Sequence, residues 1–517
     1  MLFRSTNDFS INIGKISEKG HNINAFLNLF NSNGYDLNET DILNTVEPFK
    51  NLTAFLRHNY DYKDLSFFSS FRIFTENQEF RLNESIYGNN IINESNFNTS
   101  VSLKKFDRLS FVLDNYFTRY KSEENFSSLS SNTPESFFDQ SLFKSELRSI
   151  FEINKKNKLI IGFGITDESL KRNNFYKNKV TQSSFNYFVQ YEGFIFENTN
   201  YIFGARYDQY DEYDSEFSPR FALRTQLNDN ISSKISIGKG FKTPDFRQLY
   251  FNFANSSSGY SVLGFNAAKE IIDDLQLKGQ ISNLIISENE FEGNLSPETS
   301  ISFNLGFGIK TDNNISFDIN FFRNQIKNLI DYKIIATKTN GQNIFSYYNL
   351  NKVYTQGLEF SSIFNLNDDI NFKIGYQFLD AKDNDAIKRI KNGDVYGRLS
   401  PNSTAFIIKK EDYFGLFNRS KHNINSKITF TTNNNFKVYF KSKYRSKYGL
   451  VDKNGNDILD EYDEFVNSNI ISDISISKEI KNYKITLGSD NIFNYKDPEN
   501  LPNNPGRIIY SKITITL

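Results

Sequence analysis

The strongest constraint on the fold is an alternation of apolar and polar residues with a period of two. In residues 301–309, Ile, Phe, Leu, Phe and Ile occupy the odd positions, and Ser, Asn, Gly and Gly occupy the even ones. The same alternation runs through residues 315–321, 370–378 and 509–517. Successive side chains of a β-strand point to opposite faces, so each segment predicts a strand with one apolar and one polar face. We therefore expect an all-β protein.

Two kinds of connection join the predicted strands, and they alternate along the chain almost without exception. Short polar turns lie at residues 17–20, 154–157, 197–200, 228–230, 312–314, 367–369 and 432–435. Long segments lie at residues 31–49, 78–97, 121–140, 242–295, 325–354, 382–421, 450–464 and 491–506. Such an alternation gathers the short turns at one end of the strands and the long loops at the other.

The sequence holds about 21 such strands, most of about nine residues or more, which is long enough to cross a bilayer at a tilt. We predict one large antiparallel up-and-down transmembrane β-barrel with short periplasmic turns and long extracellular loops. Polar faces that include Lys373, Lys437 and Lys441 would line a wet interior, and apolar faces would meet lipid. A soluble β-sandwich or propeller is the alternative, but those folds have shorter strands and more uniform loops.

Composition excludes several other functions. The chain has 60 Lys and Arg against 61 Asp and Glu, so nucleic acid is not an expected partner. It has no Cys and only 3 His, which leaves no disulfide, no thiolate metal site and little imidazole chemistry. No Gly-x-Ser-x-Gly or His-Glu-x-x-His motif occurs, so we do not expect an enzyme. No stretch approaches the roughly 20 continuous apolar residues of a membrane helix, and no apolar signal-peptide core follows Met1.

Four stretches carry information beyond the alternation. Residues 217–224 read Phe-Ser-Pro-Arg-Phe-Ala-Leu-Arg and lead into residues 237–250, Ile-Gly-Lys-Gly-Phe-Lys-Thr-Pro-Asp-Phe-Arg-Gln-Leu-Tyr. Residues 294–300 read Asn-Leu-Ser-Pro-Glu-Thr-Ser, and residues 355–360 read Thr-Gln-Gly-Leu-Glu-Phe. Residues 490–510 contain both Asp-Asn-Ile-Phe-Asn-Tyr and Pro-Gly-Arg-Ile-Ile-Tyr. In this order and at these distances they resemble the β-barrel of TonB-dependent outer-membrane receptors, over essentially the whole chain.

The resemblance implies a function in the cell outer membrane, in contact with outer-membrane lipid. It implies TonB-dependent import of a scarce, bulky nutrient without a cofactor and without chemical change to the nutrient. We expect an iron complex, either a siderophore or haem, with cobalamin import or a plug-less, porin-like pore as alternatives. Porins are smaller barrels and lack these motifs. A barrel enzyme, the third hypothesis, would need a pocket that holds a His or carboxylate with a perturbed pKa.

The chain also departs from the family pattern. Family members carry a signal peptide, a TonB-binding box and a plug domain before the barrel, and residues 1–517 read as barrel alone. Their barrel has about 22 strands. Counted back from Leu517, the strand at residues 8–16 runs inward, whereas the family's first strand runs outward. We therefore expect the signal peptide, TonB box, plug and first strand to be missing, and contact with TonB to require such a plug. The family also usually ends on an aromatic residue, where this chain has Leu517.

The long segment 242–295 contains a predicted helix over residues 266–279. Asn266 would be its N-cap, and Gly279 would end it. Its apolar stripe would be formed by four residues, Ala268, Ile271, Ile272 and Leu275. The segment could be a packed lid over the barrel mouth or a loop that senses the ligand.

If the segment contacts ligand, aromatic side chains are the expected contacts, namely Tyr260, Phe265 and Phe291. Phe241 and Asn294 begin the two boxes that flank the segment, Phe-Lys-Thr-Pro and Asn-Leu-Ser-Pro, and they are further candidates. In haem-type receptors, similar boxes flank a loop that carries a ligating His. No His lies between residues 242 and 295, so haem ligation by this loop is not supported.

A second loop resembles a calcium-binding loop. Asp452, Asn454 and Asn456 lie at alternate positions, and Asp463 would be the twelfth residue. The glycine is at the fourth position instead of the sixth, and Asp463 is shorter than the usual Glu. A solvated acidic loop is the alternative interpretation, and a structural calcium ion is the only metal that the sequence suggests.

Overall fold

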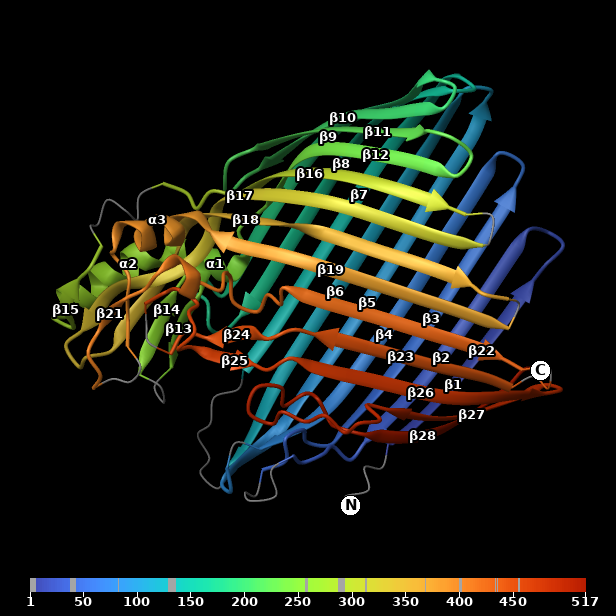
Figure 1. The fold of residues 1–517 in the computed structure, drawn as a ribbon. Helices are drawn as coiled ribbons and strands as arrows, with labels where there is room; N and C mark the ends of the chain where they lie inside the picture. The colour runs from blue at the N-terminus through green and yellow to red at the C-terminus, as the bar shows by residue number, and fades with distance from the viewer. Residues whose placement is uncertain are drawn as a thin grey trace.

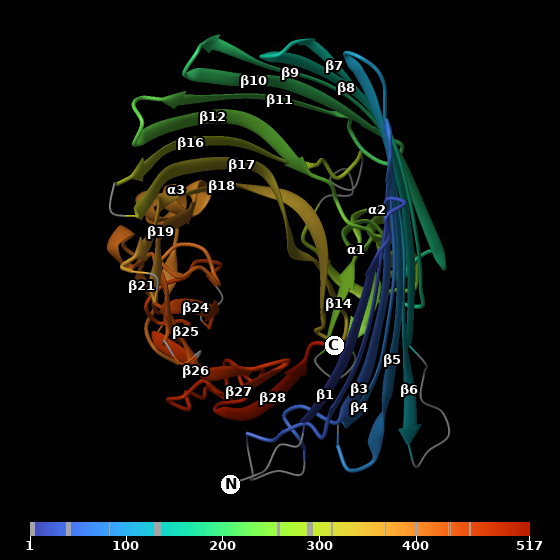
Figure 2. The same ribbon diagram turned by 90° about the vertical axis from the view of Figure 1, so that its right-hand side faces the viewer.

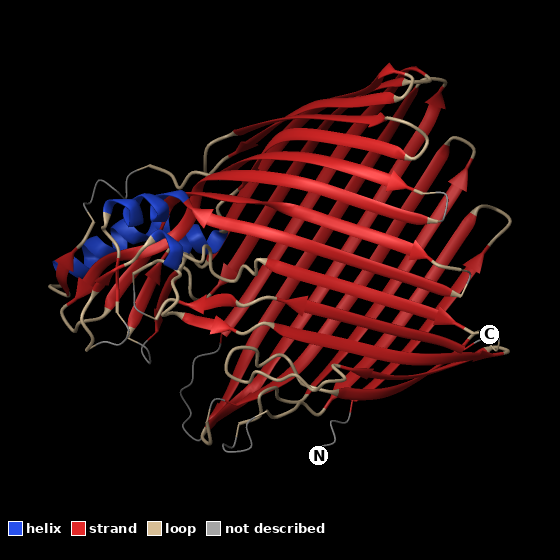
Figure 3. Cartoon of the chain, in the orientation of Figure 1, coloured by secondary structure: helices blue, strands red, loops and turns tan. Residues whose placement is uncertain are grey.

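The computed structural model describes residues 6–37, 43–81, 83–128, 136–255, 259–286, 293–311, 314–367, 369–398, 402–432, 434, 436–453 and 456–517. One large antiparallel sheet curls into a barrel, and helices with short strands gather at one end of it (Figure 1, Figure 3). Figure 2 looks along the barrel from the end that carries the short turns. No helix among the described residues is both long enough and apolar enough to span a membrane.

The large sheet has 24 strands, and three of them, β13 (Asn252–Asn255), β14 (Tyr260–Leu263) and β15 (Ile281–Leu284), belong to the group at the barrel end. The remaining 21 form the barrel wall in chain order, each antiparallel to the next. They are β1 (Thr6–Ile16), β2 (His21–Ser32), β3 (Phe49–Tyr62), β4 (Leu65–Arg81), β5 (Ile86–Phe106), β6 (Leu109–Ser128), β7 (Ser136–Asn154), β8 (Asn157–Arg172), β9 (Lys179–Phe196), β10 (Thr199–Tyr210), β11 (Glu216–Gln226), β12 (Ile231–Lys242), β16 (Glu298–Lys310), β17 (Ile315–Lys338), β18 (Asn343–Asn365), β19 (Ile370–Asp383), β22 (His422–Thr431), β23 (Phe436–Arg445), β26 (Asn469–Ile480), β27 (Tyr483–Asp490) and β28 (Ile508–Ile515). The predicted fold class and strand number are confirmed.

The outer face of the wall is apolar and the inner face is polar, as the alternation predicts. In β1, Phe9 and Ile13 on the outer face are 56% and 66% exposed. On the inner face, the Asn24 amide donates a hydrogen bond to Asn12 Oδ1 at 2.7 Å. A sheet exposes such an apolar surface stably only against lipid, so this face is the membrane-contacting one.

The first and last strands of the wall each have a single neighbour among the described residues. β1 pairs only with β2, and β28 pairs only with β27. Both run from the long-loop end to the short-turn end, because an odd number of up-and-down strands leaves the two edges parallel. All 11 residues of β1 are exposed, which reflects this unpaired edge.

Three predicted long loops are wrong, because most of their residues continue the strands. β4 and β5 pair as far as Arg81 and Tyr87, and β17 and β18 pair as far as Thr337 and Asn343. The segment 121–140 is likewise mostly β6 and β7. The outer ends of β4 to β7 lack the alternation because they carry many polar residues, as expected outside lipid, whereas those of β17 and β18 lack it because side chains such as Ile335 and Ile344 are buried under the cap. Cross-strand amide pairs hold them together, such as Asn89 to Asn77 at 3.2 Å.

Helix α2 (Phe265–Leu277) confirms the helix predicted in the long segment but begins earlier than expected. Its N-cap is Gly264, which offers no side-chain cap, so the predicted cap at Asn266 is wrong. Tertiary packing sets this start, because the Gly264 N–H donates to the Phe251 carbonyl at 2.7 Å beside helix α1 (Phe246–Tyr250). Gly279 has a φ of 64° and ends the helix as predicted.

A third helix, α3 (Asn384–Asn392), was not predicted. Its signals are present in the sequence: the Asp383 carboxylate accepts from the Asp385 N–H at 2.7 Å, and Gly393 follows with a φ of 79°. Ala386 and Ile390 lie on one face and are buried. The remaining elements at the long-loop end are β20 (Tyr396–Gly397), β21 (Phe406–Ile407), the 3₁₀ turn η2 (Lys410–Asp412), β24 (Tyr448–Val451) and β25 (Glu464–Val466).

Engineered pairs of Cys test whether β1 and β28 are adjacent. The natural chain has no Cys, so no other thiol interferes. Ile11 lies directly opposite Leu27 across β1 and β2, so an I11C/L27C variant should form a disulfide on oxidation. An I11C/I513C variant should not, because no pairing brings β1 beside β28. Both yields can be measured by mass spectrometry of tryptic peptides. Efficient I11C/I513C bonding would show that the edges close directly as a parallel pair.

Candidate ligand-binding site

The segment between β12 and β16 folds into a compact cap at the long-loop end of the barrel. Asp245 begins α1: its carboxylate accepts from the Gln248 N–H at 2.7 Å, and the Gln248 side chain accepts from the Asp245 N–H at 2.9 Å. This reciprocal capping satisfies two backbone donors that a helix start leaves free. β13 and β14 form a hairpin after α1, and β14 then pairs in parallel with β18. The cap is thereby attached to the barrel wall.

An apolar core holds the cap on the extended ends of β17 and β18. Leu263 and Ile272 from the cap, and Ile335 and Ile344 from the wall, are each at most 2% exposed. Gly264 allows α1 and α2 to approach closely, since a Cβ there would lie 2.4 Å from the Leu249 carbonyl carbon. Of the two interpretations of this segment, the structure has the features of a packed lid.

The candidate ligand contacts are dispersed. Phe265 is 6% exposed and packs edge-on against Tyr348 within the core, so it has little surface for a ligand. Tyr260 is half-buried, and its ring lies 6.2 Å from that of Phe345. Phe241 meets the ring of Tyr210 at the outer end of β12. Asn294 is exposed, and Phe291 lies outside the described residues. Among the described residues no hydrogen bond or ring–ring contact joins any two of these candidates, and their role in binding stays a prediction.

In the predicted calcium loop, the carboxylates are hydrogen-bonded to backbone amides. Asp452 accepts from the Asp457 N–H at 2.7 Å, and Asp463 accepts from the Lys453 and Asp460 N–H groups. Asn456 bonds Asp460 at 2.9 Å, and Asn454 lies outside the described residues. No cluster of three or more potential metal ligands occurs in the part of the chain that the structure describes. These contacts are those of a self-capped acidic loop.

The sequence did not reveal a cluster of cations and aromatic rings at the outer ends of β22 and β23. The rings of Phe414 and Phe465 meet edge to face at 4.8 Å. The Lys447 ammonium lies 4.0 Å from the centre of the Phe465 ring, and Lys421 lies 5.6 Å from that of Phe414. Among described side chains neither lysine has a carboxylate partner. We call Phe414, Lys421, Lys447 and Phe465 the outer cationic cluster.

Two neighbouring groups extend this surface. The Arg445 guanidinium lies 3.7 Å from the centre of the Tyr448 ring, and its Nε donates to Ser420 Oγ at 2.8 Å. The ring of Tyr413, in the loop after η2, lies beneath the Lys382 ammonium, and its centre is 5.1 Å from the Lys382 Nζ. Burial raises the pKa of Tyr413 well above its usual value, so its phenol stays neutral and adds no negative charge. Asp380 and Asp383 interact electrostatically with Lys382 and Tyr413, so the cationic and aromatic character is greatest at the outer cationic cluster itself.

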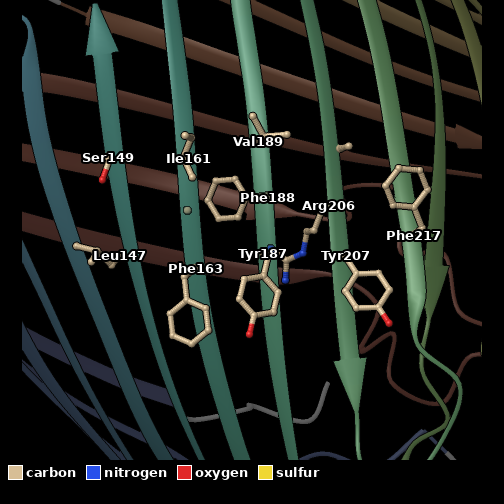
Figure 4. A pocket seen from close by; sticks show the side chains of 12 residues that line it. Leu147, Ser149, Ile161, Phe163, Tyr187, Phe188, Val189, Arg206, Tyr207 and Phe217 are labelled. Carbon is tan, nitrogen blue, oxygen red and sulfur yellow. The ribbon is translucent and has the colours of Figure 1, made fainter.

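A hollow of about 460 Å³ lies elsewhere, on the outer face of β7 to β11 (Figure 4). Its floor is a row of shorter side chains that includes Ser149, Ile161 and Val189, which are directly opposite one another across the strands. Larger side chains such as Phe163 and Tyr207 border it. Because it faces the membrane, lipid would fill it, and it is not a candidate for the nutrient site.

Comparison with known proteins identifies the fold. A family model described as "TonB dependent receptor-like, beta-barrel" matches residues 3–492. The chain belongs to this family. TonB-dependent receptors are transport proteins of the outer membrane.

Individual relatives of the receptor are distant. The ferric enterobactin receptor PirA of Pseudomonas aeruginosa is 24% identical over 185 residues, which is 35% of this chain and 23% of that protein. The ferrienterobactin receptor of Escherichia coli K12 is 25% identical over 160 residues, 30% of this chain and 19% of that protein. The matched stretches thus span less than a quarter of these curated relatives.

Solved structures confirm that the fold is shared. The crystal structure of the siderophore receptor PirA from Pseudomonas aeruginosa matches with a TM-score of 0.68 at 15% identity, covering 99% of this chain and 77% of that one. PirA from Acinetobacter baumannii matches with a TM-score of 0.70 at 15% identity, covering 99% of this chain and 78% of that one.

Truncating Ile272 should loosen the cap. Ile272 is 1% exposed, so I272A should destabilise the cap by about 2–5 kcal/mol through the cavity that it leaves. Leu277, on the same helix and 90% exposed, provides the matched control L277A, which should have little effect. Hydrogen exchange of the α2 amides measures both changes. Equal protection in the two variants would contradict the packed-lid interpretation.

Proposed function

We propose that this receptor barrel takes part in importing a ferric siderophore across the outer membrane. Family membership supports a transport role, and the curated relatives named above are ferric enterobactin receptors. The observation that favours this class of ligand is the outer cationic cluster. The ferric complex of a catecholate siderophore is an anion, because its deprotonated oxygens outnumber the charge on Fe³⁺. Aromatic rings and unpaired cations at the barrel mouth suit such a complex.

Haem and cobalamin remain less well supported alternatives. The segment 242–295 contains no His that could ligate haem iron. An unpaired cationic surface favours an anionic nutrient over an uncharged one. A plug-less pore would not need a ligand surface at all.

We also propose that import requires parts beyond residues 1–517. A plug domain with a TonB-binding box would connect the barrel to TonB, and one further strand would lie between β1 and β28. The two edges support this strand, because each exposes unpaired backbone groups that lipid cannot satisfy. A strand antiparallel to both would restore an even-numbered wall with up-and-down order.

Binding of ferric enterobactin tests the proposed ligand class. A K421Q/K447Q variant should bind radiolabelled ferric enterobactin about tenfold more weakly, since each cation–π and charge contact contributes about 0.5–2 kcal/mol. K478Q is the matched control: Lys478 lies 4.3 Å from the Phe436 ring at the short-turn end, away from the mouth. Filter binding to purified protein in detergent gives the dissociation constants. Unchanged affinity in K421Q/K447Q would remove the outer cluster from the site.

A further inference from the structure

A groove crosses the membrane-facing side of β7 to β11, and the hollow of about 460 Å³ described above is part of it. Its floor is a row of five residues that are directly opposite one another on successive strands: Ser149, Ile161, Val189, Ala205 and Pro219. None of these side chains is aromatic. The floor is open to the membrane, since Ile161 is 54% and Val189 is 42% exposed. We call this feature the outer-face groove.

Rows of larger side chains border the floor on both sides. The row nearer the long loops consists of Leu147, Phe163, Tyr187, Tyr207 and Phe217 (Figure 4). The row nearer the short turns consists of Phe151, Leu159, Tyr191, Phe203 and Phe221. Eight of these ten side chains are aromatic. Each row lies two residues from the floor along its strands, about 7 Å away, so the floor is recessed between two ridges.

The groove ends where large side chains occupy the level of its floor. On β4 to β6 that level carries Leu65, Leu103 and Phe111, and Phe111 is directly opposite Ser149. The recess is thus confined to five strands. Because adjacent strands are about 4.8 Å apart, its five floor positions span about 19 Å. One extended fatty-acyl chain can lie along such a length.

The direction of the groove keeps such a chain within one leaflet. Barrel strands tilt by about 35–45° from the membrane normal, so a row perpendicular to them descends only about 12 Å over its length. One leaflet's half of the hydrocarbon core is about 15 Å thick. The β11 end of the groove lies near the outer boundary, because Pro219 is close to Glu216, where β11 begins at the long-loop end. The β7 end, at Ser149, lies nearer the short-turn end of its strand.

The width and chemistry of the groove exclude bulkier or charged occupants. The two ridges are about 14 Å apart at the backbone, and their side chains narrow the space between them. A transmembrane helix is about 10–12 Å wide with its side chains, so it would rest on the ridges and leave the floor uncovered. No floor or ridge side chain is charged, so nothing in the groove compensates a buried charge on the occupant.

We propose that the outer-face groove holds one fatty-acyl chain of an outer-leaflet lipid at a defined site. Lipid is the medium that this face of the barrel already contacts, so the occupant is continuous with an interface that the fold requires. The aromatic ridges contact the chain along both of its sides, which gives more contacts than a flat apolar surface. The site goes beyond the proposed function, because it concerns how the barrel is held in the membrane.

Binding of 1-palmitoyl-lysophosphatidylcholine, a lipid with a single acyl chain, tests the site. Native mass spectrometry of the detergent-solubilised chain should show one retained lipid per barrel, and retention should saturate as lipid is added. Ala205→Phe places a ring on the floor and should reduce the retained fraction at least tenfold. Ala54→Phe is the matched control: Ala54 lies on the outer face of β3 between Leu27 and Ile73, and this variant should retain the lipid.

Three results would overturn the proposal. These are the absence of saturable retention by the parent, an equal loss in Ala205→Phe and Ala54→Phe, or lipid-free dimers that Ala205→Phe abolishes. The last result would indicate that a second copy of the chain covers the groove.

A fluorescence measurement keeps the site testable if Ala205→Phe fails to fold. The natural chain has no Trp, so Phe163→Trp places a unique reporter on a ridge of the groove. Phe97→Trp places it on the outer face of β5, opposite Phe117 and away from the groove. A lysophosphatidylcholine with a brominated acyl chain should quench Phe163→Trp at a severalfold lower concentration than Phe97→Trp. Quenching of both variants at the same concentration would equally refute the site.

Discussion

Backbone hydrogen bonding in a medium without water is the constraint on which the rest of this structure depends. Inside a bilayer each strand must satisfy its N–H and C=O groups on its neighbours, so the wall is one continuous ladder from β1 to β28. That ladder fixes the register, and the register fixes which side chain faces lipid and which faces the interior. The two unpaired edges are the one place in the described wall where the constraint is not met.

Cations occur on many strands of this ladder, and only some of them are paired with carboxylates. On one side, cations such as Arg206 and Lys158 have carboxylate partners across or along the strands. On β22 and β23, cations lie beside aromatic rings or beside one another, from Lys427 to Lys447. The proposal of an anionic nutrient derives from the outer cationic cluster, whose lysines lie beside aromatic rings.

Much of the barrel could be predicted, and the failures have physical causes. The alternation found the membrane-crossing strands because lipid on one side and water on the other impose it. It missed the outer half of β5, which is rich in polar residues, and that of β17, where burial under the cap replaces the lipid-facing pattern. The stripe of Ala268 and Ile272 located α2, but packing of Gly264 against α1 placed its start. Helix α3 was overlooked although Asp383 and Gly393 mark its ends.

The sequence by itself determined the class of fold, the number of strands and the face of each apolar side chain, because a period of two is a local property of a strand. Only the tertiary structure decided which distant residues meet. It buried Phe265 in the cap core and brought Lys373 and Lys427, 54 positions apart, into direct opposition. Such partnerships depend on the register between strands, which is set by turns and by long-range pairing and leaves no periodic trace in the sequence.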